Sequence, residues 1–113
     1  MPHCVVELSQ SLYPHGKDLL DVVFNAAFSS MLFKEADIKV RILTYDAYRV
    51  GTTNDEFVHV TASILSGRTV SQKSHLSQRI ASELTRYFAD HKGLSITVNI
   101  VDMDSENYQK IRL

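Results

Sequence analysis

Pro2 carries the most distinctive chemistry in the sequence, because removal of Met1 would turn its nitrogen into a free secondary amine. An α-amino group titrates at roughly pH 7.7–8.0 in peptides, and burial beside cations lowers that pKa because both effects disfavour the charged form. The result is a general base matched to neutral pH. A second interpretation stays open, in which Pro2 only starts a strand and has no ladder hydrogen bond to lose.

Two cations, Lys39 and Arg41, stand two residues apart in the apolar stretch 38–48. Side chains alternate between the two faces of a strand, so both cations lie on one face together with Leu43 and Tyr45. Two cations on the same face of a strand are unusual if that face is part of the core. An edge strand protected by charge explains the same pattern without any ligand.

The sequence offers little to other kinds of chemistry. Its five histidines are dispersed without ligand spacing and it has one cysteine, so we expect no metal site, no cofactor and no intramolecular disulfide. Cys4 fits a small buried apolar residue in a reducing compartment. No phosphate-binding loop, dinucleotide fingerprint or serine-nucleophile signature is present.

The composition is that of one globular domain spanning residues 1–113, with 44% hydrophobic and 22% charged residues. The net charge is −1 and the basic residues are scattered, which argues against nucleic acid and anionic membranes as partners. We see no long apolar span and no signal-peptide pattern, and we therefore expect a cytoplasmic protein. A chain of this length buries only somewhat over ~60% of its unfolded surface, so an oligomer is a natural way to extend the core.

Hydrophobic periodicity predicts two consecutive strand–helix–strand units. This order gives an α/β (α+β) fold class and is also compatible with a ferredoxin-like fold. The expected elements are a strand at 3–8, a helix at 17–34, a strand at 38–48, a strand at 57–65, a helix from 69 to about 91 and a strand at 96–101.

Each predicted helix has one apolar stripe that should face the sheet. Thr69 and Gln72 have capping-box spacing at the start of the second helix, and Gly93 is the expected glycine at its C-terminal end. The expected stripes are Leu20, Val23, Phe24, Ala27, Met31 and Leu32 in the first helix, and Leu76, Ile80, Leu84, Tyr87 and Phe88 in the second.

Five short stretches, in order, resemble the 5-carboxymethyl-2-hydroxymuconate isomerases of the tautomerase superfamily. They are Pro2–Glu7, Asp37–Arg41, Tyr45–Asp46, Glu56–Thr61 and Ser66–Thr69. The resemblance implies a tautomerase-like fold, in which two βαβ units form a four-stranded sheet with two helices on one face. It also implies a homotrimer. The tail itself is polar, but three of its residues could dock on a neighbouring subunit: Tyr108, Ile111 and Leu113.

The resemblance further implies an enol–keto tautomerase acting on a small muconate-type carboxylic acid. Pro2 would move the proton, with Lys39 and Arg41 as catalytic cations. Arg68 would bind a substrate carboxylate. Lys39 stands where the family carries an arginine, which keeps the charge and loses the bidentate fork. The alternative is a non-catalytic small-acid-binding or assembly domain on the same or a ferredoxin-like fold, which would tolerate an intact Met1.

Overall fold

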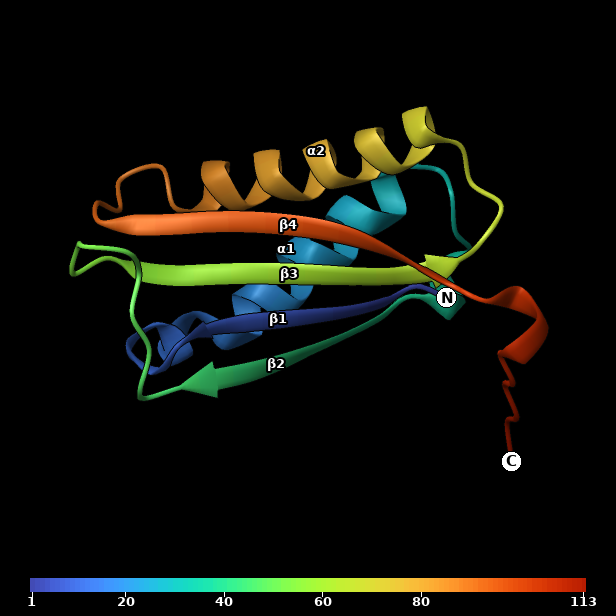
Figure 1. Ribbon diagram of the computed structural model, residues 1–113, viewed down its shortest axis with the longest axis horizontal. Coiled ribbons are helices and arrows are strands. Elements are labelled where there is room, and N and C mark those ends of the chain that lie inside the picture. The colour runs from blue at the N-terminus through green and yellow to red at the C-terminus, as the bar shows by residue number, and fades with distance from the viewer.

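A four-stranded mixed sheet is the frame of the computed structural model, which describes all of residues 1–113. Two α-helices pack on one face of this sheet (Figure 1). The main elements, in chain order, are β1 (His3–Ser9), α1 (Gly16–Ser29), β2 (Lys39–Tyr45), β3 (Glu56–Leu65), α2 (Val70–Tyr87) and β4 (Leu94–Met103). Three short 3-10 helices complete the chain: η1 (Gln10–His15), η2 (Glu35–Asp37) and η3 (Ser105–Asn107).

The strands lie in the order β2–β1–β3–β4, so the first strand of each unit is central and the second lies at an edge. β1 and β2 pair in parallel, as do β3 and β4, because a helix crosses over between the two strands of each unit. The antiparallel pairing of β1 with β3 joins the two units. The predicted pair of βαβ units is confirmed, although β2 ends at Tyr45 and not at residue 48.

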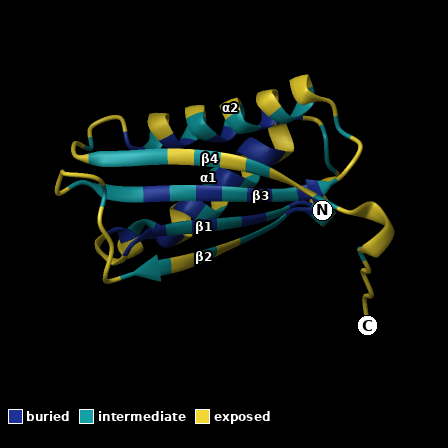
Figure 2. Cartoon of the chain, viewed as in Figure 1, coloured by how far each residue is buried: buried dark blue, intermediate teal, exposed yellow.

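Alternation along the central strands sends one set of side chains toward the helices. In β1 this set is Cys4, Val6 and Leu8, all fully buried. In β3 it is every second residue: Val58, Val60, Ala62 and Ile64 (Figure 2). These residues join the helices in a single core cluster of 17 residues. A fully buried Val, Leu or Ile contributes roughly 1.5–3 kcal/mol, so the start of β1 is firmly attached to the helical layer.

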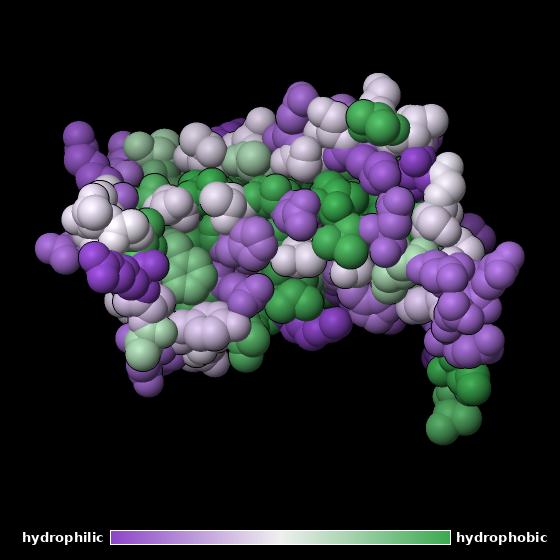
Figure 3. Space-filling model, in the orientation of Figure 1, coloured by the Kyte–Doolittle hydropathy of each residue, from purple (hydrophilic) through white to green (hydrophobic).

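The opposite face of the sheet has no helix over it (Figure 1). His3, Val5 and Glu7 of β1 are only half-buried there, and the register places Lys39 and Arg41 of β2 on the same side. Figure 3, in the same orientation, shows polar and apolar side chains intermixed on this face. The isolated chain therefore leaves a mixed surface uncovered beside the predicted cations.

α1 is shorter than the sequence predicted. It ends at Ser29, and not at residue 34, because Met31 adopts a φ of 65°, a left-handed conformation that no helix continues through. The stripe prediction was also wrong in part, since Met31 is exposed. The residues of α1 that are buried, apart from the first, are Leu19, Val23, Ala26 and Ala27.

α2 begins as predicted, with Thr69 and Gln72 in a reciprocal capping box. Its end was predicted wrongly, because the helix stops at Tyr87 and Gly93 lies in the turn before β4 with a φ of 68°. The Gly93 carbonyl accepts the N–H of Glu56 over 2.9 Å, which ties that turn to β3. Neither helix is both long enough and apolar enough to cross a membrane. Of the apolar stripe predicted for the second helix, the buried residues are Leu76, Ile80, Leu84 and Phe88.

Candidate active site

Pro2 lies immediately before β1 and is fully buried. Strand alternation places its ring on the same side as Cys4, facing the helices. Its carbonyl accepts the N–H of Lys39 over 3.0 Å, which extends the β1–β2 ladder to the very start of the strand. The proline is thus held by backbone pairing on one side and by the core on the other.

The amino terminus of the chain is docked beside Pro2. The Met1 ammonium donates to the carbonyl of Asp37 over 2.7 Å. Burial lowers the pKa of this amine and the charge of Lys39 lowers it further, while the Asp37 carboxylate opposes both. The net result is an amine that loses its proton more readily than an ordinary α-amino group.

Lys39 is the first residue of β2 and lies beside His3 in the ladder. Its ammonium donates to the Asp37 carbonyl over 3.2 Å, so the lysine and the amino terminus share one acceptor. Lys110, from the C-terminal tail, forms an ion pair with the Asp37 carboxylate at 3.1 Å. Three positive groups therefore converge on Asp37, next to the peptide bond of Pro2.

Arg41 lies two residues further along β2, opposite Val5 and not opposite Pro2. Its side chain is exposed on the open face, where Nη1 donates to Nδ1 of His3 over 3.3 Å. The structure thus brings Arg41 to His3, while the ring of Pro2 faces the other way. The position of β2 at the sheet edge also agrees with the protective-charge interpretation of its two cations.

Arg68 follows β3 in the connection to α2. Its Nη2 donates to the carbonyl of Leu32 over 2.6 Å, and its guanidinium carbon lies 5.7 Å from the centre of the Phe33 ring in a cation–π contact. Both partners belong to the connection between α1 and β2. Since the end of β3 pairs with the start of β1, Arg68 lies at the same end of the sheet as Pro2.

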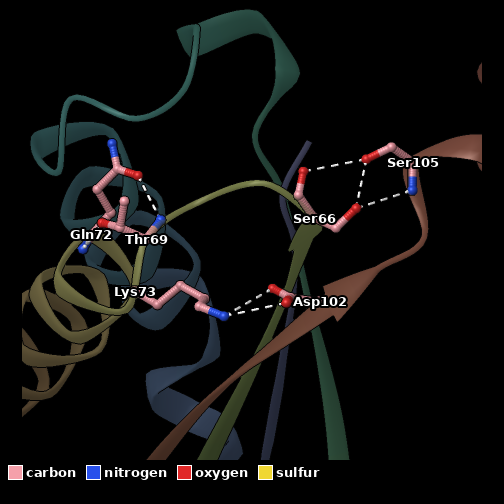
Figure 4. A network of polar contacts seen from close by, with 6 residues as sticks. All are labelled: Ser66, Thr69, Gln72, Lys73, Asp102 and Ser105. Carbon is pink, nitrogen blue, oxygen red and sulfur yellow. Dashed lines mark hydrogen bonds and ion pairs between the residues drawn. The ribbon is translucent and has the colours of Figure 1, made fainter.

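The turn that carries Arg68 is fastened on both sides (Figure 4). The hydroxyls of Ser66 and Ser105 are hydrogen-bonded at 2.8 Å, which attaches the turn to the residues after β4. Lys73 forms an ion pair with Asp102 of β4 at 3.2 Å, and the capping box fixes the first turn of α2. These contacts fix the backbone position from which the Arg68 side chain extends.

Sequence reasoning missed several residues at this end of the sheet. The backbone carbonyl of Asp37 accepts hydrogen bonds from the Met1 amine and the Lys39 ammonium, and a pattern of side chains cannot indicate a role of the backbone. The Tyr108 hydroxyl lies 2.9 Å from Nε2 of His3 in the same chain, a contact between residues 105 positions apart. The only signal for the tail was its few apolar residues, of which Ile111 and Leu113 remain exposed.

Two cavities of the chain lie at the other end of the sheet from Pro2. An open one of about 450 Å³ is lined by the loop at 46–55, and one of about 500 Å³ lies beside residues 86–91. Neither is lined by Pro2 or by the predicted cations. No group of three or more His, Cys, Asp or Glu side chains is arranged to hold a metal ion.

Comparisons with known proteins agree with this architecture. A family model described as 5-carboxymethyl-2-hydroxymuconate isomerase matches residues 2–112. No curated protein sequence matches the chain. A solved 5-carboxymethyl-2-hydroxymuconate isomerase from Deinococcus radiodurans R1 superposes with a TM-score of 0.85 at 22% identity, covering 99% of this chain and 90% of that one.

Two further solved structures are similar to the chain. A 5-carboxymethyl-2-hydroxymuconate delta-isomerase superposes with a TM-score of 0.83 at 16% identity, covering 99% of this chain and 88% of that one. A fused 4-OT described as a wild-type symmetric trimer gives a TM-score of 0.79 at 20% identity, with 97% and 92% covered. The fold is therefore tautomerase-like, which decides against the ferredoxin-like interpretation. Since the family model spans nearly the whole chain, this protein belongs to the 5-carboxymethyl-2-hydroxymuconate isomerase family and is an isomerase.

Proposed function

We propose that the protein catalyses the enol–keto tautomerisation of a carboxylated, muconate-type acid, with Pro2 as the general base once Met1 has been removed. The observation that carries this proposal is the environment of the amino terminus. Its amine is partly buried beside Lys39 and has a lowered pKa, one residue before Pro2. An amine of Pro2 in the same surroundings would be a base suited to neutral pH.

The reaction needs only a proton transfer. The neutral secondary amine takes the proton of the enol hydroxyl, which leaves a dienolate and a prolinium cation. The prolinium then returns a proton to a carbon of the conjugated system, so a C–H bond forms and the oxygen becomes a ketone. No electrons are gained or lost overall, which agrees with an isomerase that needs no cofactor.

The three cations take distinct roles in this proposal. Lys39, held beside Pro2 by the ladder, stabilises the negative charge that develops on the dienolate. Arg68 binds a substrate carboxylate, for which its planar fork is well suited. Arg41 contributes positive charge along the open face. The isomerase family favours this catalytic reading over a non-catalytic acid-binding domain.

The state of Met1 decides whether this chemistry can occur. While Met1 is attached, the nitrogen of Pro2 is part of a tertiary amide and has neither a proton to exchange nor useful basicity. The test compares chains with and without Met1, each verified by intact mass, on 2-hydroxymuconate-type acids followed by their ultraviolet absorbance. An alanine inserted between Met1 and Pro2 provides the matched control, because its processed form keeps the amide.

We expect turnover only from the chain that begins at Pro2. General-base help is worth roughly 10²–10⁴-fold, so the difference should be plain. The inserted-alanine chain should keep its fold, as measured by circular dichroism, and lose the activity. Equal rates for the chain with Met1 and the chain without it would contradict the proline mechanism.

We also propose that the active form is a homotrimer in the cytoplasm. The open face of the sheet and the exposed Ile111 and Leu113 offer surface for neighbouring copies, and the single cysteine suits a reducing compartment. A fused 4-OT of similar fold is described as a trimer. Sedimentation velocity should give the mass of three chains at working concentration, and an active compact monomer would contradict this assembly.

A further inference from the structure

Tyr108 lies across the start of β1 although it comes from the tail. Its hydroxyl is 2.9 Å from Nε2 of His3, and the two rings have centres 5.9 Å apart. Two residues later, Lys110 forms an ion pair with the carboxylate of Asp37. The backbone carbonyl of Asp37 accepts a hydrogen bond from the Met1 amine. These two contacts place the tail segment 108–110 at the border of the proposed site.

The hydrogen bond from Arg41 fixes the tautomer of His3. A guanidinium has only donors, so Nδ1 of His3 must be the acceptor in that contact. An imidazole that accepts at Nδ1 is neutral and carries its single hydrogen on Nε2. Burial lowers the pKa of His3, and Arg41 and Lys39 lower it further, which agrees with a neutral ring.

The fixed tautomer decides what Tyr108 can do. Since Nε2 of His3 carries the hydrogen, it donates to the Tyr108 oxygen, and this oxygen serves as the acceptor. The hydroxyl hydrogen of Tyr108 has no acceptor within the chain, because His3 is the only partner of that group. A hydroxyl that already accepts a hydrogen bond is polarised and is a better donor in turn.

We propose that Tyr108 is a further residue of this active site, donating its free hydroxyl hydrogen to the substrate oxygen that becomes negative when Pro2 removes the enol proton. His3 and Arg41 are positioning residues for it, acting through the chain of hydrogen bonds from Arg41 to Nδ1 and from Nε2 to Tyr108. This inference rests on the proposed function, because it needs a developing oxyanion beside Pro2. The sequence indicated Tyr108 only as a tail residue that could dock on a neighbouring subunit, whereas its hydroxyl contacts His3 of the same chain.

The kinetic test uses the Met1-free chain and a 2-hydroxymuconate-type acid that the wild type converts. Tyr108→Phe keeps the ring and should lower kcat by about 10- to 100-fold with little change in KM, because the bond forms to the charged oxygen only. His3→Leu should lose a similar factor. His3→Gln keeps a donor near Nε2 and should recover most of it. Tyr13→Phe, an exposed tyrosine at the other end of the sheet, is the matched control and should not change kcat.

A second measurement reads the positioning directly. Nitrogen-15 NMR of the imidazoles should show His3 as the neutral Nε2–H tautomer, and Arg41→Gln should raise its pKa. A wild-type kcat for Tyr108→Phe, or an Nδ1–H tautomer of His3, would overturn this inference and leave the Pro2 mechanism standing. Absence of turnover by the Met1-free wild type would overturn the proposed function, and this inference with it.

Discussion

The N–H of Lys39 donates to the carbonyl of Pro2 over 3.0 Å, so the backbone alone places the lysine beside the proline. Neither side chain takes part in this hydrogen bond. A change of the lysine side chain therefore leaves the position of Pro2 intact, which makes Lys39 a clean site for testing the role of charge.

Lys39→Met should lower kcat/KM by about 2–4 kcal/mol of transition-state stabilisation, because a cation beside the developing dienolate is lost. Lys39→Arg keeps the charge and should retain most of the activity. The measurement is steady-state kinetics on the Met1-free chain. Lys92→Met, at an exposed position in the turn before β4, is the control. A wild-type kcat/KM for Lys39→Met would remove Lys39 from the mechanism.

Arg68→Ala should lose about 2–5 kcal/mol in kcat/KM if the guanidinium binds a substrate carboxylate. Arg68→Lys should recover only part, because a point charge replaces the fork. Arg68 also bonds to the carbonyl of Leu32, so the melting temperature must be measured in parallel. Arg49→Ala is the matched control, since Arg49 likewise donates to a backbone carbonyl, that of Gly51. Unchanged kinetics for both Arg68 variants would exclude this residue from substrate binding.

The local pattern of the sequence predicted the strands and the number of helices. Alternation of apolar residues is sufficient for this, as Val58 to Ile64 illustrate. It failed where a single backbone conformation decides, as at Met31, whose positive φ ends α1 early. It also failed for Gly93, which was predicted to end the second helix but lies in the turn before β4, where its carbonyl accepts the N–H of Glu56.

The candidate site was harder to predict, because its contacts join residues far apart in the chain. The backbone N–H of Lys39 donates to the carbonyl of Pro2, while the catalytic role of its ammonium stays a prediction. Arg41 has the same spacing and character as Lys39, yet its partner is His3. The bond from Tyr108 to His3 spans almost the entire chain, and no local periodicity carries such information. The family resemblance indicated Arg68, whose role in substrate binding stays a prediction and whose contact with Leu32 likewise forms only in the folded chain.

Glu56 gives a prediction about stability and pH. The hydroxyl of Ser11 and then the ring of His91 hold the pKa of Glu56 below its usual value of 4.5. A carboxyl with a lowered folded-state pKa stabilises the fold above its ordinary pKa, and this contribution disappears as the pH falls through the lowered value. Glu56→Gln should therefore cost about 0.5–1.5 kcal/mol in the free energy of unfolding at pH 7.

The difference between wild type and Glu56→Gln should shrink in acid, as urea unfolding at a series of pH values below 5 would measure. Glu35→Gln, an exposed glutamate without a side-chain partner, should follow the wild type at every pH. A gap between wild type and Glu56→Gln that stays constant from pH 7 to the acid range would contradict the linkage.

The last prediction concerns the pKa of Pro2 in the Met1-free chain. Burial and the charge of Lys39 both disfavour the protonated amine, so its pKa should lie below the ordinary α-amino value of roughly 7.7–8.0. The base acts only when neutral. Consequently kcat/KM should be low below this pKa and rise with pH through it. Pro2→Ala should keep part of the activity, because a primary amine remains.

Lys39→Met provides the decisive comparison for this pKa. Loss of the neighbouring charge should raise the pKa of Pro2 and move the rise in kcat/KM to higher pH, in addition to lowering its plateau. Arg49→Ala, in the distant loop between β2 and β3, should leave the midpoint where it is. The amine can also be followed without substrate by nitrogen-15 NMR of Pro2, which should give the same midpoint. A rise in kcat/KM centred at or above pH 8, and unmoved by Lys39→Met, would mean that the titrating base is not Pro2.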